Sequence, residues 1–278
     1  MKRQQIEEIL KERGISPNKK LGQNFLVNPA ILERIAAASG AGPAHRILEI
    51  GPGLGFLTEF LCATGARVTA VEVDAGLYRY LREYFGGGDN PELVHADFFK
   101  YRPEGEFDRV VANLPYYCSS EILFTLARAY RVPEIYVMLQ REMAERVVSS
   151  PGSEAYGAMA VTMGFYFTSR ILFHIDRHSF YPQPDVQSSF LALQRRESLA
   201  LEPEEIELFH GLVKSAFWGR RKTLRRALSD SPHLSLPGEL LERSLAELGV
   251  APSARGETLG WEEYAGLARI LRRSGHQL

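Results

Sequence analysis

Residues 46–55 read RILEIGPGLG, a short apolar run that passes through glycines at positions 51, 53 and 55. Residues 57–63, LTEFLCA, follow directly and have the apolar spacing of a helix. An apolar strand that turns sharply through glycines into a helix is typical of the first strand-to-helix junction in a doubly wound sheet. The sequence around this turn therefore predicts an α/β fold.

Downstream of the turn, short β-branched runs alternate with longer helical stretches as far as residue 194. This alternation predicts βαβ units and a Rossmann-like sheet whose strands are mostly parallel. The last two runs have no helix between them, so we expect an antiparallel hairpin to complete the sheet. The seven predicted strands are 46–50, 67–73, 92–96, 109–112, 134–139, 170–175 and 189–194.

The strand pattern stops near residue 200, and helical periodicity continues from there toward the end of the chain. Two domains are therefore expected, because the two patterns belong to different fold classes. We place an α/β domain at 1–198 and a small all-helical domain at 199–278. The helices predicted for the second domain are 202–217, 220–228, 238–248 and 261–272.

Composition excludes several classes of protein. Hydrophobic residues make up 45% of the 278 residues and charged residues 24%, which are ordinary values for a globular chain. The N-terminal residues lack the apolar core of a secretory signal, and no stretch is apolar enough to span a membrane. The two cysteines are too few for a disulfide framework, and the histidines have no metal-ligand spacing. We expect a soluble cytoplasmic protein with no membrane partner and no metal.

The spacing of the glycines indicates the kind of ligand. A dinucleotide fingerprint needs G-x-G-x-x-G and a P-loop needs G-x-x-x-x-G-K-[ST], and neither is present. Glu49 precedes Gly51 by two residues, which makes the turn a poor site for a phosphate and a better one for a cationic ligand. We expect Gly51 and Gly53 to lie against that ligand, although a tight turn without a ligand would read the same.

Acidic residues follow the next two predicted strands. Glu72, in VEVD, is placed where a carboxylate accepts hydrogen bonds from both hydroxyls of a ribose, although a glutamate at a strand end is also common. Asp97, in HADFF, is placed to accept from the exocyclic amine of an adenine, or to cap the turn that follows it. Together with the glycine turn they describe an adenosine pocket without a phosphate, and S-adenosylmethionine is the expected cofactor.

Residues 113–116, NLPY, follow the fourth predicted strand. Asn and Pro are ordinary loop residues, but if this strand lies beside the first, the tetrapeptide faces the cofactor. The Asn113 side-chain oxygen and the Leu114 carbonyl would then accept hydrogen bonds from a purine amine and direct its lone pair at the methyl group. Pro115 would fix the turn, and the Tyr116 ring would stack on the base. These four residues are the predicted catalytic corner.

A further aromatic candidate lies in the proline-rich link between the last two predicted strands. Phe180 begins the segment FYPQPDVQSS, which the prolines make rigid and extended. We expect Phe180 to close on the other face of an extruded base and count it with the catalytic residues. The alternative is a core aromatic residue in a loop.

Seven motifs occur in order along the chain. They are LGQNFL (21–26), EIGPGLG (49–55), VEVD (71–74), HADFF (95–99), NLPYYCSS (113–120), FYPQPDVQSS (180–189) and AFWGRRKTLRRAL (216–228). Together they resemble the ribosomal RNA adenine N6-dimethyltransferase family, in particular its small-subunit dimethyladenosine transferases.

The resemblance implies a class I S-adenosylmethionine-dependent methyltransferase that dimethylates N6 of two adjacent adenosines in a hairpin near the 3′ end of 16S rRNA. It implies that the substrate is an assembling small ribosomal subunit. It also implies cofactor contacts at Asn24, Leu26, Gly51, Glu72, Asp97 and Asn113.

Residues 214–226 carry six basic side chains and no acid, in a chain whose net charge is only −1. Taken alone, such a run is usually a solvated helix face. The resemblance implies instead that it contacts the rRNA, so that each neutralised phosphate steepens the salt dependence of binding. The expected RNA-binding residues are Arg220, Arg221, Lys222, Arg225 and Arg226.

Two alternatives are compatible with these motifs. A large-subunit rRNA adenine methyltransferase of the macrolide-resistance type shares NLPY, but such enzymes tend to be far more basic than this chain. A non-catalytic rRNA-binding assembly or transcription factor would keep the same fold, but the intact cofactor residues argue against it. Whichever of these functions the chain has, we expect it to be a monomer.

Overall fold

The computed structural model describes residues 3–13, 23–219, 222–234, 236–251 and 253–275. Contacts divide the chain into two compact units, one of Met1–Ala144 with Ser169–Arg195 and one of Glu145–Thr168 with Arg196–Leu278. The chain passes from the first unit to the second after Ala144 and again after Arg195. The second of these points lies near the domain boundary expected after residue 198. The segment 145–168, expected in the first domain, belongs to the second unit instead.

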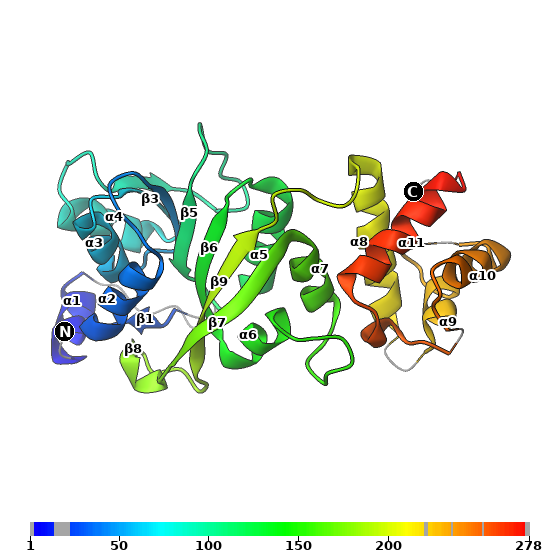
Figure 1. The fold of residues 1–278 in the computed structure, drawn as a ribbon. Helices are drawn as coiled ribbons and strands as arrows, with labels where there is room; N and C mark the ends of the chain where they lie inside the picture. The colour runs from blue at the N-terminus through cyan, green and yellow to red at the C-terminus, as the bar shows by residue number, and fades with distance from the viewer. Residues whose placement is uncertain (1–2, 14–22, 220–221, 235, 252, 276–278) are drawn as a thin grey trace. The chain divides into compact units, whose positions relative to one another are not determined.

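The first unit is built on a seven-stranded sheet with the strand order β4-β3-β2-β5-β6-β9-β7 (Figure 1). The strands from β4 to β6 pair in parallel, and β9 runs antiparallel to β6. The predicted α/β sheet is therefore present, with β9 inserted between β6 and β7. The strands are β2 (Arg46–Ile50), β3 (Arg67–Glu72), β4 (Glu92–His95), β5 (Arg109–Asn113), β6 (Glu134–Gln140), β7 (Phe167–Ile175) and β9 (Ser188–Arg195).

Two helices of the first unit begin after residues whose side chains accept hydrogen bonds from free backbone amides. The Asn28 side chain accepts from Ala30 N, with Pro29 at the first helical position, and Asp74 accepts from the amides of Gly76 and Leu77. Each cap lies directly after a strand or a turn, so the chain reverses within a few residues. The helices are α1 (Arg3–Glu12), α2 (Pro29–Ala38), α3 (Phe56–Ala63), α4 (Ala75–Tyr84), α5 (Ser119–Ala129) and α6 (Arg141–Val147).

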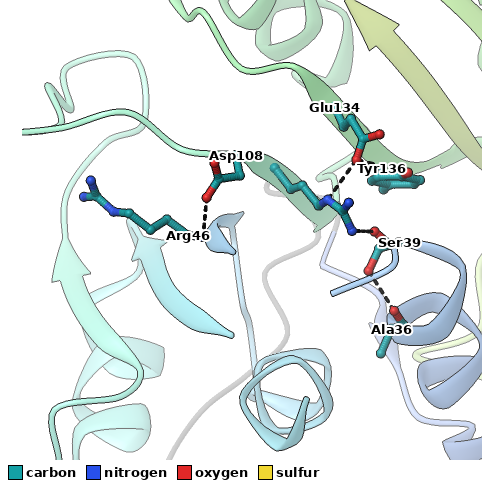
Figure 2. A network of polar contacts seen from close by, with 7 residues as sticks. Ala36, Ser39, Arg46, Asp108, Glu134 and Tyr136 are labelled. Carbon is teal, nitrogen blue, oxygen red and sulfur yellow. Dashed lines mark hydrogen bonds and ion pairs between the residues drawn. The ribbon is translucent and has the colours of Figure 1, made fainter. Parts of the chain in front are cut away.

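Figure 2 shows a polar network at the amino ends of the central strands. Arg46 N donates to Asp108 Oδ2 at 2.7 Å, which joins the start of β2 to the residue before β5. Arg109, the first residue of β5, pairs with Glu134 of β6 at 2.8 Å and donates to the Ser39 carbonyl after α2. These contacts join the amino ends of three strands to the carboxyl end of α2. The carboxyl ends of the same parallel strands meet at the opposite edge of the sheet.

A second, two-stranded sheet joins segments that are far apart in the sequence. β1 (Phe25–Leu26) pairs antiparallel with β8 (Phe180–Tyr181), and Figure 1 shows the two side by side. A 3₁₀ turn, η2 (Arg177–Ser179), leads into β8. The sequence does not predict this sheet, because two-residue strands have no periodicity.

The second unit is helical. Phe165 of α7 stacks on Phe209 of α8 with ring centroids 4.4 Å apart, and α11 lies beside α8 (Figure 1). α7 has the sequence AMAVTMGFY, which is apolar on nearly every side and therefore buried in this helical core. The elements are α7 (Ala158–Tyr166), α8 (Pro203–Trp218), α9 (Leu224–Ser229), α10 (Gly238–Glu247), η3 (Gly256–Thr258) and α11 (Trp261–Arg273).

One predicted helix differs at its start. The helix expected from residue 220 begins at Leu224, because the Thr223 side chain caps α9 by accepting from Arg226 N. The preceding helix, α8, ends at Trp218. Residues 220 and 221 lie outside the described part of the chain. Within the described ranges, no helix combines the length and apolarity that crossing a lipid bilayer would require.

Candidate active site

The carboxyl ends of β2, β3 and β5 place three predicted site residues at one level of the sheet. The parallel register of β2 with β3 and β5, continued past the last paired residues, puts Gly51 level with Glu72 and with Asn113. Strand order reverses at β2, with β3 on one side and β5 on the other. A ligand crevice is expected at such a switch point, just outside the carboxyl ends of the strands.

A cavity opens at this switch point. Its walls include the glycine turn, the end of β3, the segment around β1 and all four residues of NLPY. Among its lining residues, all of which the structure describes, the charged side chains are Glu49 and Glu72, and none is basic. The cavity therefore suits a cationic or neutral ligand better than a phosphate.

The glycine turn brings bare backbone to the cavity. Gly51 and Gly53 have φ of +68° and +61°, a left-handed conformation that favours glycine. A Cβ atom at Gly53 would lie 2.9 Å from Phe25 Cδ1, so the turn and the β1 segment are in close contact. A Cβ atom at Gly51 would lie 3.9 Å from Pro115 Cδ, which places the turn next to NLPY.

Glu72 is buried at the end of β3 and accepts two backbone hydrogen bonds. Gly53 N donates to Oε2 at 3.2 Å and Asp74 N donates to Oε1 at 2.9 Å. Burial raises the pKa of the Glu72 carboxyl above its ordinary value, while the two amides act against this rise. Each carboxylate oxygen can accept more than one bond, so both can also accept from a pair of ligand hydroxyls.

Glu49 is a further acid in the cavity, and in the sequence it indicated that the turn suits a cationic ligand better than a phosphate. Its side chain is 1% exposed, and Oε2 accepts from Thr58 Oγ1 at 2.6 Å. Burial raises the pKa of this carboxyl to about 8, although the Thr58 hydrogen bond lowers it. A positive charge bound beside Glu49 would favour the ionised form.

The NLPY corner is tied to the N-terminal segment. Asn113 Nδ2 donates to the backbone carbonyl of Asn24 at 3.0 Å, so the side-chain oxygen is the atom of this amide that can accept from a ligand. Leu114 N donates to Met138 O on β6 at 3.3 Å. The Tyr116 hydroxyl lies 2.7 Å from Ser188 Oγ of β9, which fixes one end of the ring.

The predicted N-terminal cofactor residues lie in the cavity wall. Asn24 and Leu26 both line the cavity, and Leu26 is opposite Phe180 in the β1–β8 pair. Phe180 is 4% exposed and belongs to the hydrophobic core of the first unit. In this conformation the buried ring is not available to stack on a base. Phe180 is therefore a core aromatic residue here, which was the alternative considered in the sequence analysis.

Asp97 is placed differently from the other cofactor candidates. It is not among the residues that line the cavity, and its Oδ1 accepts from Phe99 N at 3.0 Å. This is the capping role weighed as the alternative to adenine recognition. Its charge acts on the cavity mouth, where it contributes to the raised pKa of Tyr117, which burial and the Cys118 contact raise to about 12.

Two apolar residues at the cavity were missed from the sequence as site residues. Val73 and Tyr117 both line it and are 50% and 55% exposed, unusually high values for large apolar side chains. Each is adjacent to a predicted site residue, Val73 after Glu72 and Tyr117 after Tyr116. The signal available in the sequence was their position, because each directly follows a predicted ligand contact.

The basic cluster belongs to the second unit. Arg220 and Arg221 lie outside the described residues. Lys222 pairs with Asp230 at 2.9 Å, Arg225 pairs with Glu242, and Arg226 is exposed on α9. Among the described residues, no group of three His, Cys, Asp or Glu side chains is arranged to hold a metal ion.

The sequence profile of the family described as ribosomal RNA adenine dimethylase matches residues 14–271. The ribosomal RNA small subunit methyltransferase A of Moorella thermoacetica is 37% identical over 282 residues, covering 95% of this chain and 96% of that protein. The protein of the same name from Enterococcus faecalis is also 37% identical, with 96% of this chain and 95% of that protein covered.

Two solved structures resemble the chain over most of its length. A dimethyladenosine transferase from Plasmodium falciparum has a TM-score of 0.79 at 24% identity, covering 91% of this chain and 99% of that one. The 23S rRNA methyltransferase ErmE has a TM-score of 0.69 at 28% identity, covering 89% and 99%. The fold is that of the class I S-adenosylmethionine-dependent methyltransferases, as predicted.

Proposed function

The chain belongs to the ribosomal RNA adenine dimethylase family, and we propose that it transfers methyl groups from S-adenosylmethionine to N6 of two adjacent adenosines near the 3′ end of 16S rRNA. The products are N6,N6-dimethyladenosines. It is thus an S-adenosylmethionine-dependent rRNA adenine dimethyltransferase. The observation that carries this proposal is a cavity at the switch point that holds two buried glutamates, no basic residue and the NLPY corner.

The residues of the cavity fit S-adenosylmethionine. Glu72 holds two acceptor oxygens at the level of Gly51, where a ribose meets bare backbone. Glu49 places a second carboxylate in a wall without any cation, which suits a ligand with a sulfonium and an ammonium group. Asn24 and Leu26 would cover the cofactor from the β1 side, and Val73 would pack on the adenine. When bound, the cofactor supplies an electrophilic methyl group.

The NLPY corner would orient the target base. With Asn113 Nδ2 held by Asn24 O, the Asn113 oxygen and the Leu114 carbonyl accept from the two hydrogens of the adenine amine. This would direct the nitrogen lone pair at the position of the cofactor's methyl group, and the proton that the amine loses would pass to solvent. Pro115 fixes the corner and the Tyr116 ring stacks on the base. Holding two reactants in such geometry contributes on the order of 7–11 kcal/mol to catalysis.

Asp97 and Phe180 do not line the cavity in this conformation. For Asp97, the second carboxylate oxygen would reach the adenine of the cofactor, since Oδ1 is used by Phe99 N. For Phe180, a role at the base requires its ring to leave the core. In the present conformation it holds β8 against Leu26, so we assign it to shaping the wall that the cofactor and the base share.

The rRNA would be held by the basic cluster of the second unit, Arg220, Arg221, Lys222, Arg225 and Arg226. Lys222 and Arg225 pair with exposed acids, which RNA phosphates would replace. We propose that the protein acts as a monomer in the cytoplasm on an assembling small subunit. A large-subunit target is the competing assignment, because ErmE, which is named for 23S rRNA, shares the fold at 28% identity. The higher identity of the small-subunit relatives favours 16S rRNA.

The test is to offer tritiated S-adenosylmethionine with undermethylated small subunits and, separately, large subunits. We expect label only in small-subunit rRNA, and primer extension should stop at two adjacent adenosines near its 3′ end. Asn113→Ala is the matched negative control. Label in large-subunit rRNA would support the competing assignment. Label in neither rRNA would refute the proposed methyl transfer and favour a non-catalytic RNA-binding protein.

A further inference from the structure

Trp218, the last residue of α8, has an unexpected environment. Its side chain is 50% exposed. The other large apolar side chains with comparable exposure, Val73, Tyr84, Tyr117 and Val186, all belong to the first unit. In the described part of the second unit Trp218 therefore stands alone as a large apolar side chain left in solvent.

Trp261 shows what a structural tryptophan looks like in the same unit. Its ring lies against Phe165 at 6.0 Å and under the Arg196 guanidinium at 4.6 Å, and it abuts Gly164. Trp218 also has a cation over its ring, but the described residues place no aromatic ring against it, and half of its surface is exposed. Packing therefore explains Trp261, while the exposure of Trp218 calls for a partner outside the chain.

A cation is held over the Trp218 ring by the local backbone. Lys222 N donates to Gly219 O at 2.8 Å, which holds Lys222 close to the end of α8. Its stem packs on Gly219, where a Cβ atom would lie only 3.0 Å from Lys222 Cδ, and its Nζ lies 4.9 Å from the centre of the Trp218 ring. The ring and the ammonium thus form one exposed element, which also includes the ion pair to Asp230.

Further basic side chains lie on α8 and α9, and Asp230 and Glu242 pair with Lys222 and Arg225. Lys214 is exposed one turn before Trp218 on α8, and Arg226 is exposed on α9. No acidic residue occurs between positions 214 and 226. An aromatic ring framed by cations matches a nucleotide, which offers a flat base next to a phosphate, and matches a protein surface less well.

We propose that Trp218 is a stacking platform for an unpaired base of the substrate rRNA, with Lys222 and Arg226 binding the adjacent phosphates. The proposal rests on the function proposed above, because it assumes an rRNA partner. The other residues proposed to bind rRNA are all basic, so the stacking on Trp218 would be the one contact of this surface that is not electrostatic. Stacking and charge pairing respond differently to salt, and this difference makes the two separable.

The test uses the full-length protein and tryptophan fluorescence. The chain has two tryptophans, so Trp261→Phe leaves Trp218 as the single indole. Unmodified, protein-free small-subunit rRNA is the probe. We expect the RNA to quench this fluorescence at saturation. If Trp261→Phe does not fold, the difference between the parent protein and Trp218→Phe reports the same signal.

Binding constants then separate stacking from charge. Trp218→Ala should bind this rRNA about 5- to 100-fold more weakly, with an unchanged slope of log Kd against log salt. Trp218→Phe, which keeps a ring, should restore most of the affinity. Arg226→Gln should instead make the slope shallower by about one. Circular dichroism confirms that each variant is folded.

Three outcomes would overturn the proposal: parental affinity in Trp218→Ala, a changed salt slope in that variant, or quenching by assembled subunits but not by protein-free rRNA. The last would point to a ribosomal protein as the partner. Methyl transfer by the parent protein is measured in parallel on undermethylated small subunits. If the parent methylates and Trp218→Ala binds normally, the stacking proposal fails alone. If the parent transfers no methyl group, the proposed function fails.

Discussion

Asn113 donates a hydrogen bond from Nδ2 to the backbone carbonyl of Asn24 at 3.0 Å. This bond joins the loop after β5, which would orient the target base, to the N-terminal segment, which would cover the cofactor. The two parts of the proposed site are therefore in direct contact. A change at Asn113 should affect methyl transfer strongly and cofactor affinity mildly.

Asn113→Ala removes both the acceptor proposed for the adenine amine and the donor to Asn24. We expect the single-turnover rate of methyl transfer to fall about 100-fold or more, because the base loses its orientation. Cofactor affinity should fall only about 2- to 10-fold, the value of one hydrogen bond. Isothermal titration calorimetry and a rapid-quench assay measure the two.

Asn90→Ala is the matched control, because Asn90 also bonds backbone atoms through its amide, at Ala66 O and Val68 N, but does not line the cavity. It should cost stability without changing the single-turnover rate. Equal losses of cofactor affinity and rate in Asn113→Ala would place this amide in the cofactor site alone.

Gly53→Ala tests the contact between the glycine turn and β1. Gly53 and Gly86 have similar φ values of +61° and +65°, so alanine at either costs about 1–2 kcal/mol of strain. A Cβ atom at Gly53 would strike Phe25, whereas at Gly86 nothing lies within 4 Å. Both variants should unfold at lower urea, but only Gly53→Ala should weaken cofactor binding by about tenfold or more, a change of ~1.4 kcal/mol. Similar cofactor affinities in the two variants would show that the contact with Phe25 does not shape the site.

The fold could be predicted where the sequence carries periodicity or turn chemistry. Apolar runs located the strands of the main sheet, and the RILEIGPGLG turn with NLPY indicated which strand ends form the site. The β1–β8 pair could not be predicted, because its two-residue strands are specified by packing between distant segments. The same packing buries Phe180, and the local cap formed by Asp97 was only one of two outcomes that its sequence allowed.

Tyr116 separates a ring effect from a hydroxyl effect. Its hydroxyl bonds Ser188 Oγ, so Tyr116→Phe loses one hydrogen bond and should slow methyl transfer only about 2- to 10-fold. Tyr116→Ala also loses the stacking surface, worth about 1–3 kcal/mol per base, and should raise the KM for rRNA about 5- to 100-fold. Cofactor affinity, measured by calorimetry, should stay near the parental value in both. If Phe is as damaging as Ala, the hydroxyl contact and not the ring is what the reaction needs.

Glu49 should make both stability and cofactor binding depend on pH. Burial raises its pKa from 4.5 to about 8, so between these values the native protein keeps a proton that the unfolded chain has released. Stability from this group is complete below pH 4.5 and is lost as the pH rises through 8. Glu49→Gln has no such loss. Between pH 5.5 and 8.5 its free energy of unfolding in urea, relative to that of the parent protein, should therefore rise by on the order of a few kcal/mol. A constant difference across this range would mean that Glu49 is ionised throughout.

The same carboxyl should couple the cofactor to protons. A cationic ligand favours ionised Glu49, so binding near pH 7 should release a proton, and the Kd should fall by up to about tenfold per pH unit between pH 6 and 8. Calorimetry in two buffers of different ionisation enthalpy counts the released proton. Glu49→Gln should bind more weakly at pH 8, with no proton release and a flat pH profile. Proton release that persists in Glu49→Gln would assign the coupling to another group, and the nearest buried carboxyl in the cavity is Glu72.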